Sequence, residues 1–164
     1  VAVFNKDAYI WAKNCREKFD VVIIDFPDPS NYSLGKLYSL NFYATIQKLL
    51  NQDAVVVIQT TSPYFAPKSF WCINKTVMQV FPQIDAYHAY VPSFGEWGFT
   101  IAINGFGTTF NTVNRKVDAL RFYNYQFDKF NYFSQDMISK DIEINRLDNQ
   151  ILVRYFDEEW GKLQ

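Results

Sequence analysis

One short stretch of the chain, VVIIDFPDP at residues 21–29, restricts the folds that the sequence can adopt. Residues 21–24 are β-branched and end at Asp25, and such a run bounded by turn residues is typical of a strand buried on both faces of a parallel sheet. The prolines on either side of Asp28 have no backbone N–H, so the strand cannot continue. The stretch therefore predicts a buried strand whose carboxyl end carries two carboxylates.

The other patterns along the chain predict an α/β fold. Apolar runs alternate with helical periodicity, as in right-handed β-α-β units, and the last two strands are close enough to form an antiparallel hairpin. The expected strands are residues 1–4, 21–24, 54–58, 84–91 and 98–104, and the expected helices are residues 8–18, 35–50 and 70–81.

The remaining sequence is less regular. The aromatic run at residues 122–130 predicts a helix that buries aromatics or forms an interface, and residues 142–160 predict extended pieces or a short helix. We expect a domain at residues 1–104 and an aromatic-rich extension at residues 105–164 that packs on it.

Composition excludes several classes of function. A net charge of −1 gives no electrostatic basis for binding nucleic acid or an anionic membrane, and no apolar run reaches the roughly 18 residues of a membrane helix. Cys15 and Cys72 lack zinc-site spacing, and His88 is the only histidine, so we expect no metal. Two reduced thiols are favoured, with a disulfide left open. For His88, a packed or surface role is favoured over catalysis.

Polar residues follow the carboxyl ends of three predicted strands. Asp7 lies just beyond the first strand, Asp25 ends the second, and Gln59 with the 62–64 loop follows the third. In open parallel sheets ligands bind at this edge. Polar groups that converge on one edge are what a small-molecule site requires.

These acids also have structural interpretations. Asp7 is of a type that caps helices, and Asp28 before a proline is a common turn former. Asp25 has the strongest functional case, because a carboxylate pressed against a buried strand end is costly unless it is hydrogen-bonded or used. Burial would raise its pKa and make it a better base, whereas a cationic substrate would lower that pKa. Spacing alone leaves both interpretations open.

Four blocks of the sequence resemble, in order and spacing, the second half of the spermidine synthases, which are polyamine aminopropyltransferases. The family patterns are D-V-I-I-x-D-x-x-D-P, L-F-x-x-x-Y-Y, a strand ending in Gln, and I-P-T-Y-P-x-G-x-x-G-F. The matching blocks are DVVIIDFPDP at 20–29, LYSLNFY at 37–43, VVVIQ at 55–59 and VPSFGEWGF at 91–99. Residues 143–156 are similar to a bacterial subfamily whose longer members carry a membrane-embedded region upstream.

The resemblance implies a partial class I methyltransferase-like Rossmann fold that lacks its first strands. It also implies transfer of an aminopropyl group from decarboxylated S-adenosylmethionine, a co-substrate rather than a tightly bound cofactor, to a polyamine such as putrescine. Asp25 matches the family's general base, and Asp28 matches the acid that helps to hold the amine. The resemblance also places Gln59 near the amine channel and implies the nucleoside residues Asp7, Ala8, Pro29 and Leu37. Tyr87 and Glu96 are further candidates for binding the substrate.

The residue types suit these ligands. A diamine and a sulfonium are both cations, so carboxylates and aromatic walls attract them by Coulomb and cation–π interactions. Tyr64, Trp71 and Trp97 are candidates to wall such a pocket, with core packing as the alternative, and we place Tyr64 on the substrate side.

Several positions depart from the family pattern and leave the amine acceptor open. Thr61 replaces the glutamate of Gln-x-Glu, and Tyr87 is offset by one from the family tyrosine. Glu96 is a candidate to restore the missing charge, or a solvated loop charge. The other replacements are Ala8 for glycine and Ser93-Phe94-Gly95 for Thr-Tyr-Pro.

The family's glycine-rich nucleotide loop, ribose-binding acid and N-terminal β-hairpin domain would all precede residue 1. We therefore expect a fragment that does not bind the nucleoside tightly by itself and is active only within a longer parent. We expect the domain to be cytoplasmic, and a tether to the inner membrane is left open. A homodimer is also left open. The expected partners are a polyamine and a nucleoside sulfonium, and not nucleic acid.

Two other functions remain open from the sequence. The chain is alternatively a non-catalytic relative that binds a nucleoside or amine, or an interaction module. An S-adenosylmethionine-dependent methyltransferase is a third, weaker option, because two acids after this strand suit an amine acceptor better.

Overall fold

Four strands form one mixed sheet in the order β1-β2-β4-β3. The computed structural model describes residues 1–107, 133–134, 137–139 and 141–161. The strands are β1 (Phe19–Ile24), β2 (Leu50–Gln59), β3 (Gln83–Val91) and β4 (Gly95–Ile103). The helices are α1 (Ala8–Asn14), α2 (Tyr32–Gly35), the 3₁₀ turn η1 (Lys36–Tyr38), α3 (Leu40–Gln47), α4 (Pro67–Met78) and α5 (Ile151–Trp160).

The pairing of the strands confirms the predicted α/β order. β1 and β2 are parallel, with Ile24 opposite Ile58, and the chain between them forms α2, η1 and α3. β2 is antiparallel to β4, and β3 and β4 form the expected antiparallel hairpin. The parallel pair therefore brings the carboxyl ends of β1 and β2 to the same edge of the sheet.

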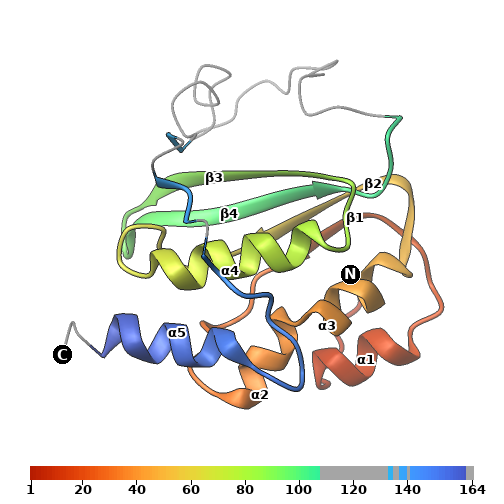
Figure 1. Cartoon of the computed structure of the whole chain (residues 1–164). Helices are drawn as coiled ribbons and strands as arrows, with labels where there is room; N and C mark the ends of the chain where they lie inside the picture. Colours follow the sequence, from red (N-terminus) through yellow and green to blue (C-terminus); the bar gives the residue numbers. More distant parts are fainter. Residues whose placement is uncertain (108–132, 135–136, 140, 162–164) are drawn as a thin grey trace.

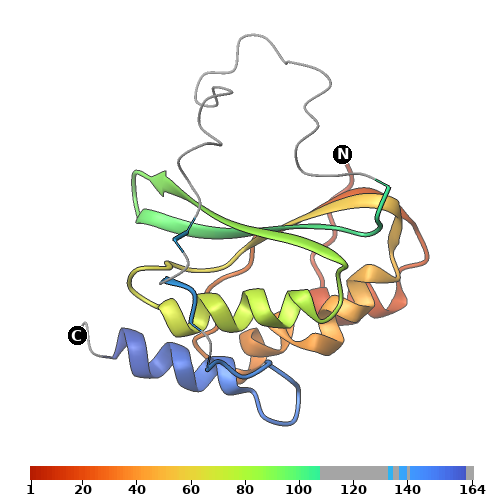
Figure 2. The same ribbon diagram turned by 45° about the horizontal axis from the view of Figure 1, so that its top comes forward.

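The helices of the described part of the chain lie on one side of the sheet (Figure 1; Figure 2). Ile24, Val56 and Ile58 point toward them and are buried in the core. Val21 and Ile23 are on the other face, with 61% and 74% of their surface exposed. The prediction that β1 is buried on both faces is therefore wrong, because strand side chains alternate and the described helices cover only one face.

Residues 1–4 do not form the predicted strand. Val1, Val3 and Phe4 are exposed, and none of the described strands pairs with this segment. An isolated extended segment has no neighbour to receive its backbone hydrogen bonds, so an apolar run alone does not make a strand.

Local capping explains where the helices differ from prediction. The expected helix at 35–50 is divided at Ser39, whose backbone is extended and whose Oγ accepts from the Phe42 N–H at 3.3 Å, so that α3 begins at Leu40. The helix expected at 8–18 ends at Asn14, because Cys15 is extended. The predicted cap is confirmed: the Ile10 N–H donates to Asp7 Oδ1 at 3.1 Å.

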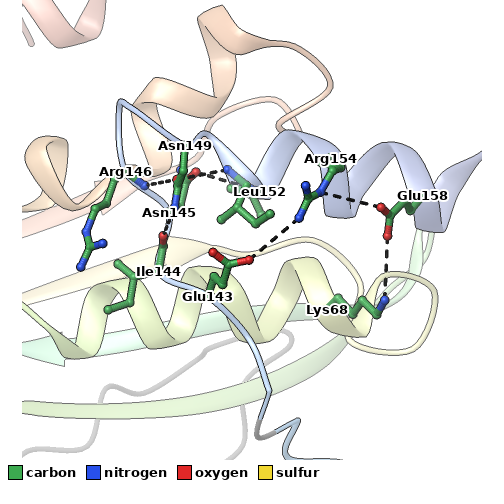
Figure 3. A network of polar contacts seen from close by, with 10 residues as sticks. Lys68, Glu143, Ile144, Asn145, Arg146, Asn149, Leu152, Arg154 and Glu158 are labelled. Carbon is green, nitrogen blue, oxygen red and sulfur yellow. Dashed lines mark hydrogen bonds and ion pairs between the residues drawn. The ribbon is translucent and has the colours of Figure 1, made fainter.

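A buried asparagine ties the C-terminal segment to the helical layer. Residues 142–150 are irregular and lead into α5, so the predicted short helix is present. Asn145 is fully buried, and Figure 3 shows its side chain within a network of polar contacts beside Leu152 and Asn149. The helix or interface predicted at 122–130 lies outside the described residues, and the division of the chain at residues 104 and 105 stays a proposal.

Helix α4 receives its N-terminal cap from α5. Ala66 precedes the helix and makes no side-chain cap. Both oxygens of Glu159 accept instead from the first turn: the Lys68 N–H donates at 2.7 Å, and Ser69 donates from its N–H at 3.0 Å and its hydroxyl at 2.7 Å. A carboxylate near the N-terminus of a helix satisfies free N–H groups and interacts favourably with the helix dipole. The cap therefore joins α5 to the N-terminus of α4.

Replacing Glu159 with alanine should lower the free energy of unfolding by about 1–2 kcal/mol, because a charge-assisted cap is lost. Glu158 is the matched control, since it is a neighbouring carboxylate that meets Lys68 and Arg154 only at 3.8 and 3.9 Å on the surface. Glu158→Ala should cost no more than about 0.5 kcal/mol. Urea unfolding of both variants measures the difference, and equal losses would show that the cap contributes nothing.

Three further observations bear on the class of protein. None of the helices in the described ranges is long and apolar enough to cross a bilayer. Those residues also contain no group of three or more side chains arranged to hold a metal ion. Cys15 and Cys72 are both free thiols, and Cys72 is buried.

Candidate active site

The acids of the D-x-x-D-P block line a cavity at the carboxyl ends of the two parallel strands. Asp25 directly follows β1, and Gln59 is the last residue of β2. With Asp28 they line a cavity of about 650 Å³. Its other walls are almost entirely apolar and are formed by Ile23, Ile24, Phe26, Pro27, Val57, Val91, Phe94, Trp97 and Phe99. Of the polar residues predicted to converge, Asp25 and Gln59 therefore line one cavity, together with Asp28. Asp7 and residues 62–64 are not among its lining residues, so the predicted convergence is observed only in part.

Hydrogen bonds connect the polar groups of this cavity. The Gln59 side-chain amide donates to Asp28 Oδ1 at 3.3 Å. The hydroxyl of Tyr38 lies 3.4 Å from Gln59 Oε1, and 3.1 Å from each of the carbonyl oxygens of Phe26 and Pro27. Tyr38 is fully buried, and its hydroxyl thus connects the polar groups of the site to the core.

The two carboxylates lie in different environments. Asp28 is half-buried, and burial raises its pKa, while the hydrogen bond from Gln59 opposes the rise. Asp25 is exposed, so the burial expected for this carboxylate is not observed, and the more buried acid of the pair is Asp28. None of the ion pairs among the described residues involves either acid. Among the described residues, no side-chain cation is therefore paired with the carboxylates of this cavity.

Tyr64, Tyr87 and Glu96 are not among the residues that line this cavity. The Glu96 carboxylate lies 2.7 Å from Nδ1 of His88, and the Tyr64 ring meets the same imidazole edge-on, with 5.6 Å between ring centroids. Tyr87 stacks on Phe99 with 5.4 Å between centroids. The substrate roles predicted for these three residues stay predictions.

The predicted nucleoside residues lie apart from Asp25. Asp7 lines a separate hollow of about 490 Å³, caps α1 and pairs with Lys36 at 2.8 Å. The hydrogen bond from Lys36, with that from the Ile10 N–H, holds the pKa of Asp7 below its usual value. Ala8 is the first residue of α1, and Pro29 and Leu37 are buried. Their contact with a nucleoside stays a prediction.

The loop after Gln59 is held in an uncommon conformation. Thr61 has a φ of 65°, which is costly for a β-branched residue. Its carbonyl accepts from the Gly98 N–H at 2.8 Å, and a Cβ on Gly98 would lie 2.7 Å from that oxygen. Gly98 therefore permits the close approach of β4 that fixes this turn.

Sequence reasoning missed Tyr38. It lies within the LYSLNFY block, but a tyrosine in an amphipathic stretch is ordinarily a core residue. Its contact with the loop that carries the acids depends on the path of residues 26–28, which no local pattern specifies. The block match was the only available signal.

Comparison with known proteins agrees with the geometry. The profile of the spermine/spermidine synthase domain matches residues 1–116. The polyamine aminopropyltransferase of Leptospira interrogans is 46% identical over 167 residues, which cover 99% of this chain and 32% of that protein. Polyamine aminopropyltransferase 2 of Ralstonia nicotianae is 46% identical over 98% of this chain and 31% of its own length. The chain thus spans about a third of the length of these curated relatives.

Solved structures show a shared fold. A spermidine synthase in complex with the transition-state analogue AdoDATO superposes with a TM-score of 0.56 at 20% identity, covering 96% of this chain and 50% of that one. The spermidine synthase from Thermotoga maritima gives 0.52 at 18% identity, over 94% and 47% of the two chains. The mixed sheet and its helices thus match the methyltransferase-like fold of spermidine synthases. From the domain match and the 46% identity together, we conclude that the chain belongs to the spermine/spermidine synthase family, the polyamine aminopropyltransferases.

Proposed function

We propose that this chain is the acceptor-side part of an aminopropyltransferase that uses decarboxylated S-adenosylmethionine and a polyamine such as putrescine. The observation that carries the proposal is a cavity at the ends of β1 and β2 that holds Asp25 and Asp28, neither of which forms an ion pair within the part of the chain that the structure describes. Such a cavity favours a cationic ligand by Coulomb attraction, most strongly where water is excluded.

In the proposed reaction, an amine nitrogen of the acceptor attacks the aminopropyl carbon next to the sulfonium. The new C–N bond forms as the C–S bond breaks, the sulfur keeps the bonding electrons, and neutral methylthioadenosine leaves. The nitrogen must lose a proton, and we assign its removal to Asp25. Positioning of the two reactants supplies much of the remaining rate acceleration.

Asp28 is assigned to binding the acceptor amine. Its half-buried carboxylate has a raised pKa, so ionising it costs free energy in the empty site. A bound ammonium group would offset that cost and keep Asp28 charged. Gln59 holds Asp28 in place, and the ring of Trp97 offers a wall on which a cationic chain can rest.

We propose that catalysis needs a longer protein, here called the parent. The chain's extent, about a third of its curated relatives, supports this proposal. The nucleoside residues are Asp7, Ala8, Pro29 and Leu37, and Tyr64, Tyr87 and Glu96 complete the acceptor side. Titration of the isolated chain with methylthioadenosine should give no binding in the micromolar range, and a micromolar Kd would contradict this part of the proposal.

The activity is tested by incubating the purified parent with decarboxylated S-adenosylmethionine and putrescine. We expect methylthioadenosine and spermidine in equal amounts. A second arm supplies S-adenosylmethionine with the same amine. Methylation in that arm without aminopropyl transfer in the first would make the protein a methyltransferase and overturn the proposal.

One observation favours a second candidate, a non-catalytic module that binds an amine. Thr61 stands where the family pattern has a glutamate, and Glu96 is paired with His88 outside the cavity lining. A parent that binds putrescine but transfers nothing would support this candidate.

A further inference from the structure

The backbone of the loop that carries both acids is hydrogen-bonded to the core through Tyr38. The carbonyl oxygens of Phe26 and Pro27 lie between Asp25 and Asp28 in the chain, and each is 3.1 Å from the hydroxyl of Tyr38. The Phe26 ring also meets the ring of Tyr38 edge-on, with 6.4 Å between centroids. Tyr38 thus contacts the loop through both its hydroxyl and its ring.

The loop has few other means of anchoring its backbone. The prolines at 27 and 29 have no N–H to donate, so they cannot extend the ladder of the sheet. Within the loop, the Ser30 N–H turns back to the Asp28 carbonyl at 2.7 Å, which stiffens it locally but does not attach it to the core. Anchors therefore have to come from side chains. The Phe26 ring packs on the buried ring of Phe42, with 5.7 Å between centroids, and Tyr38 supplies the hydrogen bonds to the loop backbone from a fully buried position.

The same hydroxyl is connected to the carboxylate of Asp28. It lies 3.4 Å from Gln59 Oε1, and the Gln59 amide donates to Asp28 at 3.3 Å. A hydroxyl has one proton, and the three oxygens around it are all acceptors, so its bonds to them are shared. Removing the hydroxyl therefore loosens the loop backbone and the Gln59 side chain together.

We propose that Tyr38 is a positioning residue that fixes Asp25 and Asp28 relative to each other through the loop carbonyls and Gln59. This inference rests on the proposed aminopropyl transfer. Tyr38 does not touch the reacting atoms. Its hydroxyl acts by holding the base where the amine proton is removed.

The test compares two buried tyrosines in the full-length parent, Tyr38 in η1 and Tyr43 in α3. Tyr38→Phe removes the anchoring hydroxyl and keeps the ring. Tyr43→Phe is the matched control, because Tyr43 is also fully buried and its hydroxyl has no hydrogen-bond partner among the described residues. Tyr38→Phe should lower kcat about tenfold and change the KM for putrescine less than about threefold, because misplacing a catalytic group lowers the rate more than binding. Tyr43→Phe should keep the wild-type kcat.

Hydrogen–deuterium exchange gives a second readout that does not depend on activity. The peptide containing residues 25–31 should exchange faster in Tyr38→Phe than in Tyr43→Phe, with peptides of α4 unchanged. Equal kcat in the two variants, a loss confined to KM, or equal exchange in this peptide would each overturn the role of Tyr38. A parent with no aminopropyl transfer would overturn the proposed function instead, and the exchange comparison would still decide whether Tyr38 anchors the loop.

Discussion

Asp25→Asn should lower kcat for aminopropyl transfer in the parent by about 10²–10⁴-fold, the usual contribution of a general base. Asparagine is nearly isosteric and keeps the acceptor oxygen, but it cannot take a proton. The side chain is exposed at the end of β1, so the substitution should change stability little. Initial rates with saturating putrescine measure the effect.

The pH dependence of the loss separates a base from a binding group. An alkyl ammonium has an ordinary pKa near 10.4, so a rising pH supplies deprotonated amine without help from the enzyme. The defect of Asp25→Asn should therefore shrink as pH approaches about 10. A defect that stays constant with pH would show that Asp25 only attracts the amine.

Asp20 provides the matched control on the same strand. It lies in β1 away from the cavity, and its carboxylate accepts from Asn51 at 2.8 Å. Asp20→Asn makes the same charge change and should leave kcat within about twofold, since surface substitutions away from a site have small effects. If Asp25→Asn behaves like Asp20→Asn, Asp25 is not the base.

The sequence predicted the parts of the fold that depend on local patterns. β-branched runs located β1 and β2, and the short connection at Pro92 and its neighbours indicated the hairpin of β3 and β4. The burial of β1 was not predictable in the same way. Whether Val21 and Ile23 are covered depends on which face the helices occupy, and this is decided by the path of the whole chain rather than by the strand itself.

The candidate site was predictable to the same extent. Asp25 directly follows β1 and Gln59 ends β2, and because these strands pair in parallel, topology alone brings the two residues together. Tyr38 reaches the loop from a helical turn by tertiary packing, and Glu159 caps α4 across 90 residues of sequence. Contacts of this kind have no periodic signature, and they were absent from the sequence-based prediction for that reason.

Asn145→Ala should lower the free energy of unfolding by about 2–5 kcal/mol, because it leaves two buried backbone groups without a hydrogen-bond partner. The Asn145 side-chain amide donates to the Gly35 carbonyl at 3.0 Å, and its Oδ1 accepts from the Leu152 N–H at 3.3 Å. The Asn145 backbone adds two more bonds, since its N–H donates to Thr76 Oγ1 at 3.0 Å and its carbonyl accepts from the Leu40 N–H at 2.9 Å. One fully buried residue thus joins segments from α2 to α5.

The matched control for this prediction is Asn149, in the turn shown in Figure 3. Its Oδ1 accepts from the Arg146 N–H at 2.9 Å and the Ile151 N–H at 3.3 Å, and its amide donates to the Ile144 carbonyl at 3.0 Å. Asn149 makes at least as many bonds as the Asn145 side chain, but they are at the surface, where water replaces a lost partner. Asn149→Ala should therefore cost only about 1 kcal/mol. Urea unfolding of both variants measures the losses. If they are equal, burial adds nothing to these hydrogen bonds, and Asn145 is an ordinary turn residue rather than the connection between the C-terminal segment and the helical layer.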